Sequence, residues 1–225
     1  MKLLALDTSS AACSAALMIN NEVKTLFEIT PRAHSDLILS MCDKLLQEAE
    51  LLPSQLDGIG FGRGPGSFTG LRIAAGVTQG ISFAANIPVI PVSSLAALAQ
   101  KTHSDSQKNN ILVAVDARMQ EVYWGRFHFT EGKLMGSKEG ICHPEALHAT
   151  DEHQWFAVGD AWKVYHDQFE QKLISNIIGF NTCSLPCAEN IAYLALQDLT
   201  DGNTYPPEKA IPVYLRNNVA KKSSQ

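Results

Sequence analysis

GRGPGSFTGLR, at Gly62–Arg72, is the stretch that decides the fold. Three glycines and a proline stand directly before an apolar segment with helical spacing. Glycine is favoured where the backbone takes unusual dihedral angles or approaches another group closely. A glycine-rich turn that leads into a helix also leaves N–H groups and the positive end of the helix dipole facing outward. The stretch is therefore either an anion-binding turn or a tightly packed connection from strand to helix.

The elements on either side of this turn are compatible with both an anion-binding turn and a tightly packed connection. A short strand over Asp57–Phe61 leads into it, and a helix over Ser67–Ala85 follows, with Ser67 in position to cap the helix. The helix is rich in small residues, although glycine destabilises helices. Gly70, Gly76 and Gly80 therefore indicate a close approach, either to the sheet of this chain or to another subunit.

The flanking sequence predicts further strands and helices of an α/β protein. Strands are expected over Lys2–Leu6, Ala12–Ile19, Val23–Ile29, Ile87–Pro91 and Trp155–Val158, and helices over His34–Leu51, Ser93–Gln100, Asp160–Phe169 and Pro186–Leu199. The polar stretch Thr102–Asn110 lacks periodicity and is predicted to be a linker. The tail Pro206–Arg216 is predicted to be extended.

A weak internal repeat predicts two related lobes. LLALDTSSAACSAAL, which begins at Leu3, and ILVAVDARMQEVYWGRF, which begins at Ile111, both read strand, aspartate, turn, strand. Each lobe would then open with a β-hairpin that carries an aspartate at its tip. We place the N-terminal lobe at residues 1–104 and the C-terminal lobe at 105–225.

Charge and cysteine content narrow the class of protein. The formal net charge is −5, which argues against a protein that binds nucleic acid by itself. The Lys221-Lys222 pair is too short for a basic tail. Five scattered cysteines form no CxxC pair, which favours a reduced, cytoplasmic setting. No segment has the length of a membrane span or the pattern of a signal peptide.

An anion or nucleotide site is one hypothesis for the two hairpin tips and the glycine-rich turn. Its candidate residues are Asp7, Thr8, Ser9, Arg63, Gly64, Gly66, Asp116 and Arg118. In this hypothesis Asp7 would hold a hydrated Mg²⁺. The second tip speaks against a phosphate clamp, because it lacks glycine and contains the bulky Arg118 and Met119. The alternative is that Asp7 and Asp116 cap their own turns, with Arg118 paired to Asp116.

Metal and nucleophile chemistry find little support. His143, His148 and His153 recur every five residues, which fits a solvated surface better than one helical face. No HxxxH or HExxH pattern occurs. His34 stands beside Ser35 at a helix-capping position. Ser67 lacks the spacing of a nucleophile elbow. We therefore predict neither a metal site nor a catalytic residue.

The chain resembles the TsaB (YeaZ) family over almost its full length. The residues that carry the resemblance include MKLLALDTSSAACSAAL, AHSDLIL, GRGPGSFTGLRIAAGVTQGISFA, IPVIPVSSLAALA, VAVDARMQEVYW and IPVYLRNNVA. The resemblance implies the two-lobed fold of actin, Hsp70 and sugar kinases (ASKHA), with a reduced second lobe. It also implies a role in placing threonylcarbamoyl on the adenosine 3′ of the tRNA anticodon.

The resemblance further implies a subunit without catalysis of its own. Family members support the catalytic paralogue TsaD together with the ATPase TsaE. TsaD proteins carry an HxxxH metal pair after the strand that follows the glycine-rich helix. Aligned there, this chain has Ser94 and Leu98, and leucine cannot ligate a metal. The resemblance leaves open an ATP or ADP with Mg²⁺ at the interface of the assembled complex.

The helices over Ser35–Leu51 and Ser67–Ala85 are the predicted partner surface. TsaD would dock there, a homodimer would use the same face when the chain is alone, and tRNA would be reached through the complex. No membrane contact is expected. The candidate interface residues are His34, Leu37, Ile38, Met41, Leu71, Arg72, Ala74, Ala75, Gly76 and Thr78.

Three other functions remain as alternatives. A glycoprotease-like peptidase would need a metal pair or nucleophile that the sequence lacks. An ATPase or kinase of the same fold would bind Mg-ATP tightly despite the altered second tip. A stand-alone RNA-binding module would bind tRNA without TsaD despite the acidic balance.

Overall fold

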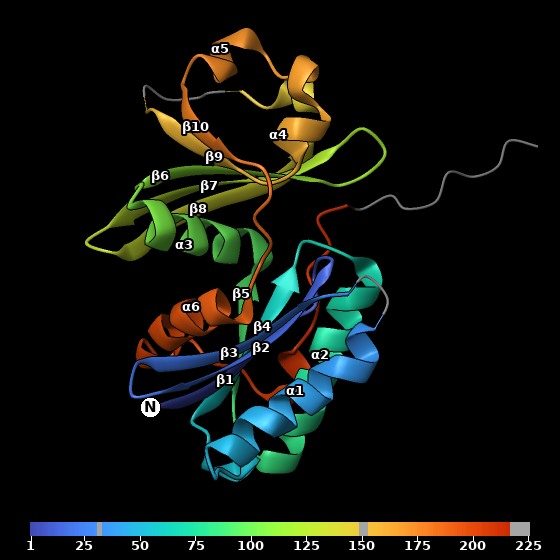
Figure 1. Cartoon of the computed structure of the whole chain (residues 1–225), viewed down its shortest axis with the longest axis vertical. Helices are drawn as coiled ribbons and strands as arrows, with labels where there is room; N and C mark the ends of the chain where they lie inside the picture. Colours follow the sequence, from blue (N-terminus) through green and yellow to red (C-terminus); the bar gives the residue numbers. More distant parts are fainter. Residues whose placement is uncertain (31–32, 149–152, 217–225) are drawn as a thin grey trace, which may run out of the picture.

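The computed structural model describes residues 1–30, 33–148 and 153–216, so the Lys221-Lys222 pair lies outside the described residues. Within these ranges the chain forms two five-stranded mixed sheets, one in each lobe (Figure 1). Their strand orders are β3-β2-β1-β4-β5 and β10-β9-β6-β7-β8. An antiparallel hairpin, β1–β2 or β6–β7, stands at the same place in both sheets. The predicted two-lobed α/β fold and its duplication are confirmed.

Local sequence features explain the strands and turns of the first sheet. Its strands are β1 (Lys2–Asp7), β2 (Ala12–Ile19), β3 (Glu22–Ile29), β4 (Gly58–Gly64) and β5 (Val89–Ser93). Asn20 and Asn21 both have positive φ, 50° and 73°, as the tight β2–β3 turn requires. β1 and β2 are buried almost throughout because helices cover both faces of the sheet.

The second sheet was predicted only in part. Its strands are β6 (Asn110–Asp116), β7 (Val122–Thr130), β8 (Lys133–Cys142), β9 (Trp155–Val158) and β10 (Ile177–Asn181). The sequence alone did not predict β8 or β10. Each contains glycine and mixes polar with apolar residues, so neighbouring strands determine their conformation more than intrinsic preference does.

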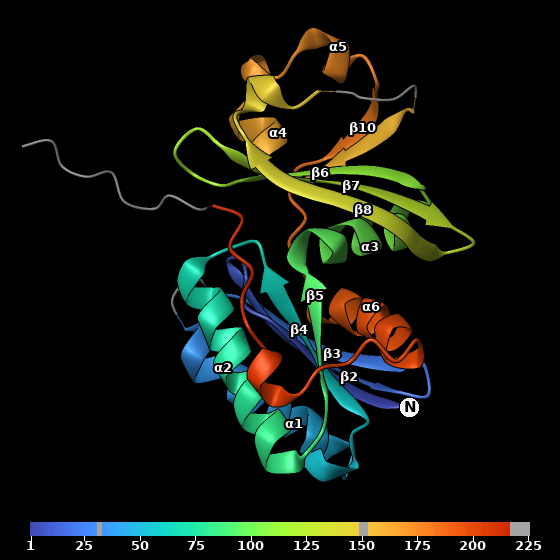
Figure 2. The same cartoon turned by 180° about the vertical axis from the view of Figure 1, so that it is seen from behind.

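Helices fill the spaces around the sheets. They are α1 (His34–Glu48), α2 (Phe68–Ala85), α3 (Ser94–Ser106), α4 (Ala161–Val164), α5 (Gln171–Ile174) and α6 (Ala188–Thr200). α1 and α2 cover one face of the first sheet and α6 covers the other (Figure 2). α3 packs between α6 and the second sheet, so one apolar cluster spans both lobes.

Two predictions about chain organisation are wrong. Thr102–Asn110 is not a linker, because α3 continues to Ser106 with Thr102 and His103 buried. The lobe boundary is also not a single point near residue 104. α6 packs on β1, β2 and β4 of the first lobe. The following segment stays there, since Tyr205 bridges to Val89 and the Val213 N–H donates to the Arg63 carbonyl at 2.8 Å.

Candidate functional site

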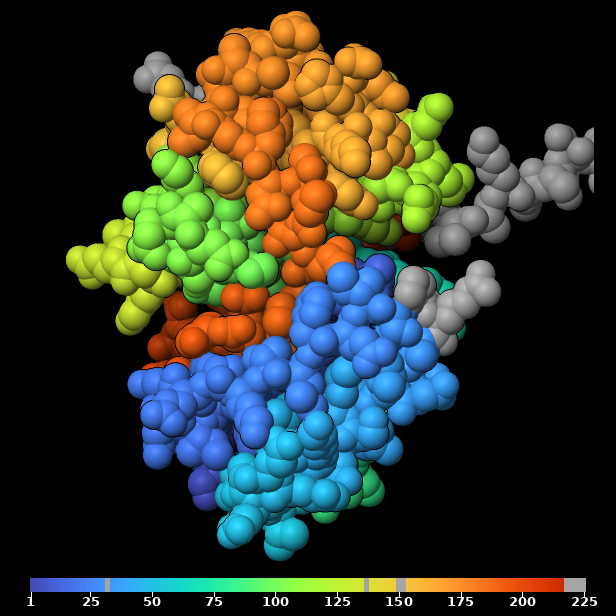
Figure 3. Space-filling model, viewed as in Figure 1, coloured from blue at the N-terminus to red at the C-terminus, as the bar shows by residue number. Residues whose placement is uncertain are grey.

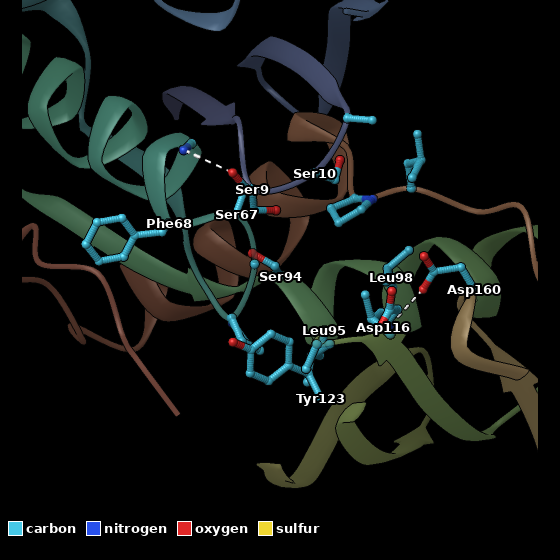
Figure 4. Close-up of a pocket in the computed structure, with 18 of the residues that line it drawn as sticks. Ser9, Ser10, Ser67, Phe68, Ser94, Leu95, Leu98, Asp116, Tyr123 and Asp160 are labelled. Atoms are coloured by element: carbon cyan, nitrogen blue, oxygen red, sulfur yellow. Dashed lines mark hydrogen bonds between the residues drawn. The ribbon is translucent and has the colours of Figure 1, made fainter. Parts of the chain in front are cut away.

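A cleft between the lobes is the first candidate site. It has a cavity of about 630 Å³. The tip of the β1–β2 hairpin, the first turns of α1, α2 and α3, and the β6–β7 tip surround it (Figure 4). Residues on its walls include Ser9, Ser10, His34, Ser67, Thr69, Ser94, Leu98, Asp116, Arg118, Tyr123, Asp160 and Ser184.

The glycine-rich turn packs against the first hairpin tip. The Ser67 N–H donates to the Ser9 carbonyl at 2.7 Å, and the Thr8 hydroxyl donates to the Gly70 carbonyl at 2.7 Å. A Cβ at Gly66 would overlap the Ser9 backbone, and one at Gly70 would overlap the Thr8 carbonyl. These two glycines are therefore required for close packing within the chain. Ser67 caps α2, as predicted, by accepting from the Gly70 N–H at 3.4 Å.

Asp7 is buried beneath this turn rather than presented to the cleft. The Ser9 N–H and hydroxyl donate to its Oδ1 at 3.1 and 2.9 Å. Its Oδ2 has no partner among the described residues and abuts Gly62. Burial raises the pKa of Asp7 to about 6, which the bonds from Ser9 offset in part.

These facts do not fit Mg²⁺-phosphate binding through Asp7. A carboxylate that holds a hydrated cation must be ionised and accessible. Asp7 and Thr8 are fully buried and absent from the walls of the cavity. At the first tip, the Ser9 carbonyl already accepts from the Ser67 N–H, and the Thr8 hydroxyl already donates to the Gly70 carbonyl. Of the predicted anion-binding set, Ser9, Gly66, Asp116 and Arg118 line the cavity, whereas Asp7, Thr8, Arg63 and Gly64 do not.

The second tip is a left-handed turn whose charges are already paired. Arg118, Met119 and Gln120 have positive φ between 56° and 63°. Arg118 Nη1 lies 3.0 Å from Asp116 Oδ2, which is the pairing that the sequence left open as an alternative. The Tyr165 hydroxyl also donates to Asp116 Oδ1, at 2.8 Å. The Asp116 carboxylate is therefore neutralised by its own turn.

The C-terminal segment holds this second tip from outside. Arg216 Nη2 donates to the carbonyls of Ala117 and Arg118 at 3.0 and 3.1 Å and lies 2.5 Å from the Glu121 carboxylate. Upstream, the Val213 carbonyl and N–H cover Gly64 and Arg63. We call residues 206–216 the C-terminal strap; it joins the first lobe to the β6–β7 turn (Figure 2).

The cleft shows no metal centre. Within the described residues, no group of three or more His, Cys, Asp or Glu side chains is arranged to hold a metal ion. Ser94 and Leu98 both line the cavity from α3, one turn apart (Figure 4). The positions that the sequence compared with a metal pair therefore face the cleft, but they present a hydroxyl and an apolar side chain. His34 lies at the cleft edge and binds the Ser10 carbonyl through Nε2 at 3.0 Å. The N-cap of α1 is Ala33, so the expected capping by His34 and Ser35 does not occur.

Most predicted interface residues lie inside the chain. His34, Ile38, Met41, Leu71, Ala74, Ala75 and Thr78 are buried, and Leu37 is half-buried. Ile38, Met41, Ala74 and Ala75 belong to the core between α1, α2 and the sheet. They cannot contact a partner directly, because their faces of the helices already cover the sheet. Arg72 and Gly76 are exposed.

The exposed side of α2 is a stripe that includes Arg72 and Gly76 of the predicted interface set. It runs through Phe68, Arg72, Gly76, Gly80 and Ala84 at every fourth residue, all exposed. A Cβ at Gly76 or Gly80 would meet nothing within 4 Å. Phe83 beside the stripe is 81% exposed. The four-residue spacing of small residues was the available signal, although it does not say which face meets the sheet.

The fold and the cleft define the class. This is a two-lobed α/β protein of the actin, Hsp70 and sugar-kinase type, and its inter-lobe cleft is lined by hydroxyl, apolar and a few charged groups. Residues 25–224 match the family model described as "TsaD: tRNA N6-adenosine threonylcarbamoyltransferase". The chain belongs to that family and, within it, to the TsaB (YeaZ) proteins.

Relatives over nearly the full length support this assignment. The tRNA threonylcarbamoyladenosine biosynthesis protein TsaB of Escherichia coli K12 is 36% identical, over 99% of this chain and 97% of its own length. That of Haemophilus influenzae is 38% identical, over 99% and 96%. The structure of YeaZ from Pseudomonas aeruginosa superposes with a TM-score of 0.88 at 40% identity, over 95% of this chain and 99% of its own.

A second Pseudomonas aeruginosa structure aligns equally well. It has a TM-score of 0.88 at 40% identity, covers 96% of this chain and 99% of its own, and is described as similar to peptidase YeaZ. Among the described residues, no helix is both long and apolar enough to cross a bilayer.

Proposed function

We propose that this chain is a non-catalytic subunit in tRNA threonylcarbamoyladenosine formation in the cytoplasm. It binds the catalytic paralogue TsaD, acts with the ATPase TsaE and reaches tRNA through the complex. When alone it pairs with a second copy through the same face. The relatives named for this biosynthesis support the pathway. The open stripe of α2 is the observation that carries the partner role.

The geometry of α2 suits a partner helix. Three small residues, Gly76, Gly80 and Ala84, leave a shallow track along the exposed side of the helix. Small residues at this spacing allow two helix backbones to approach closely. Phe83, next to Ala84 in the helix, is 81% exposed, and Leu39 on the neighbouring helix α1 is 55% exposed. Exposed apolar side chains next to an open track are typical of a surface that a partner covers.

The cleft supports the non-catalytic role. Acyl transfer needs a group that activates the carbonyl, such as a metal ion or an oxyanion site. Ser94 and Leu98, which face the cavity from α3, offer no metal pair. Asp7 is buried and Asp116 is neutralised by Arg118. The sequence pattern that could activate the substrate belongs instead to the TsaD paralogue.

The test is Gly76→Leu. Nothing within 4 Å of this position obstructs a side chain, so the variant should fold, but leucine should fill the track. We expect TsaD binding, measured by calorimetry, to weaken at least tenfold and the homodimer, measured by light scattering, to dissociate. The reconstituted tRNA modification should fall with the binding. Gln171→Leu, an exposed change on α5, is the matched control and should leave all three unchanged.

Two results would contradict the proposal. TsaD affinity that is unaffected by Gly76→Leu would show that the interface lies elsewhere. Tight Mg-ATP binding or turnover by the isolated chain would instead favour an ATPase or kinase, and a peptide-cleaving activity that follows the purified chain would favour a peptidase.

A further inference from the structure

Three exposed side chains form a cluster at the N-terminal end of the α2 stripe. Phe68 and Arg72 come from α2, and Tyr214 comes from the C-terminal strap, 142 positions after Arg72. The strap follows α2 for two turns, since the Gln79 amide also donates to the Ala210 carbonyl at 3.2 Å. In Figure 3 the blue β3 and α1 hide most of α2, whereas Figure 2 shows the helix from behind with the strap beside it. The strap therefore borders the face that we propose for TsaD.

The guanidinium of Arg72 is held in one orientation by the other two side chains. Its Nε donates to the Tyr214 hydroxyl at 3.2 Å, and its central carbon lies 3.8 Å from the centre of the Phe68 ring. The two aromatic rings are in contact, with centroids 5.4 Å apart. A guanidinium that is already stacked and hydrogen-bonded loses less conformational entropy when a ligand binds. Arg72 is therefore preorganised although it is exposed to solvent.

The two Nη groups of Arg72 are left for a ligand. Within the described residues, its side chain donates to Tyr214 alone and has no carboxylate within ion-pair distance, whereas Arg118 and Arg216 are paired with acidic residues of the second hairpin. The planar guanidinium fork can hold a carboxylate by two parallel hydrogen bonds. In a chain with a net charge of −5, Arg72 is thus a fixed positive charge without a counter-ion from its own chain.

We propose that Arg72 binds an aspartate or glutamate side chain of TsaD, with Tyr214 as a positioning residue. This inference rests on the proposed function, because it assigns a contact within the same face. Arg72 and Gly76 are one turn, about 6 Å, apart along α2. A TsaD helix that packs in the track at Gly76 therefore brings a carboxylate to Arg72 from about one turn beyond its own closest approach. Arginine and tyrosine are also the residue types that most often dominate the binding energy of an interface.

The test compares Arg72→Gln and Arg72→Lys in calorimetric titrations with TsaD, at low and high salt and with and without ADP. We expect Arg72→Gln to weaken binding at least tenfold and to reduce its dependence on salt, because a charge-assisted pair is lost. Arg72→Lys keeps the charge without the fork, so its affinity should lie between the other two. Lys172→Gln, which removes an exposed positive charge from α5, is the matched control and should bind as the wild type does.

Tyr214→Phe tests the positioning role. It removes the hydroxyl that fixes Arg72 Nε, so binding should weaken by less than in Arg72→Gln, with the salt dependence and the melting temperature unchanged. A tyrosine that only supports the fold would instead lower the melting temperature and leave the affinity as it is. On the TsaD side, exposed carboxylates are replaced by amides one at a time. One replacement should weaken binding as Arg72→Gln does and add no further loss when the two are combined.

Three results would overturn the inference. Unchanged affinity in Arg72→Gln, with binding still weakened by Gly76→Leu, would keep the proposed face and remove Arg72 from it; unchanged affinity in both would contradict the proposed function as well. A loss seen only with ADP present would assign Arg72 to a nucleotide phosphate. Dissociation of the homodimer by Arg72→Gln, with TsaD affinity unchanged, would assign the arginine to a second copy.

Discussion

Asp7, buried beneath the glycine-rich turn, has a strongly raised pKa. Its pKa rises from 3.8 to about 6 because burial disfavours the charged form. The folded state therefore holds this proton more tightly than the unfolded state does. Its contribution to stability is complete below about pH 3.8 and is lost as the pH rises through about 6. The full difference corresponds to about 3 kcal/mol.

Asp7→Asn is the corresponding test. Asparagine keeps an oxygen for the two Ser9 donors and carries no charge. We expect the variant to be more stable than the wild type at pH 8, by up to about 3 kcal/mol, and equally stable near pH 4. Urea unfolding at both pH values measures this. Glu208→Gln, an exposed carboxyl, should show neither effect. A wild-type advantage at pH 8 would mean that the ionised Asp7 has a ligand or partner.

At the scale of single elements, α2 contains two glycines with opposite requirements. Gly70 faces the Thr8 carbonyl, whereas Gly76 faces open space. Gly70→Ala should destabilise the chain by about 3 kcal/mol or more, because the added methyl overlaps backbone. Gly76→Ala should stabilise it by about 0.5–1 kcal/mol, because alanine is the better helix former. Thermal and chemical unfolding of the two variants compare the same substitution in one helix. Equal effects would contradict the packing described for the turn.

The same helix shows where sequence reasoning succeeds and where it stops. The Ser67 cap, the turn before it and the close approach of a glycine were predictable, because each depends on residues within a few positions. The orientation of the helix was not. Apolar and small residues occur on every side of α2, so the sequence could not tell whether Ala74 or Gly76 lies on the surface. Packing on the sheet buries Ala74. The burial of Asp7 was likewise hidden, since it depends on Gly62, far along the chain.

At the scale of the whole molecule, the C-terminal strap fixes the β6–β7 turn. Arg216 is 16% exposed and satisfies two carbonyls and Glu121 of a turn in which three residues hold positive φ. Left-handed backbone costs about 1–2 kcal/mol for each such residue, so the turn depends on outside support. Arg216→Ala should lower the unfolding free energy by about 2–3 kcal/mol.

Hydrogen exchange separates this local role from a general loss of stability. In Arg216→Ala, the amides of Ala117–Glu121 should exchange faster under native conditions, while those of β1 and β2 should not. Lys209→Ala, an exposed change within the same strap, should alter neither. Unchanged exchange at the turn would show that it holds its shape without the strap.

The lobes themselves were foreseeable, because the repeated pattern of strand, aspartate and strand lies within short windows. The return of the chain to the first lobe was not. Pro186–Leu199 has a helical pattern, yet nothing local says which of two sheets it will cover. Likewise, β8 is a strand because it pairs with β7.

The position of α6 has a consequence for synthesis. Residues 188–200 form the helix that covers one apolar face of the N-terminal sheet. On the ribosome, β1 to β5 are made first, yet that face stays open until α6 leaves the exit tunnel, after β6 to β10 have been made. The N-terminal lobe therefore cannot complete its folding ahead of the C-terminal lobe, as sequential domains usually do. A chain that stops before α6 would expose Leu3, Ala5 and Met18 and depend on chaperones to stay unaggregated.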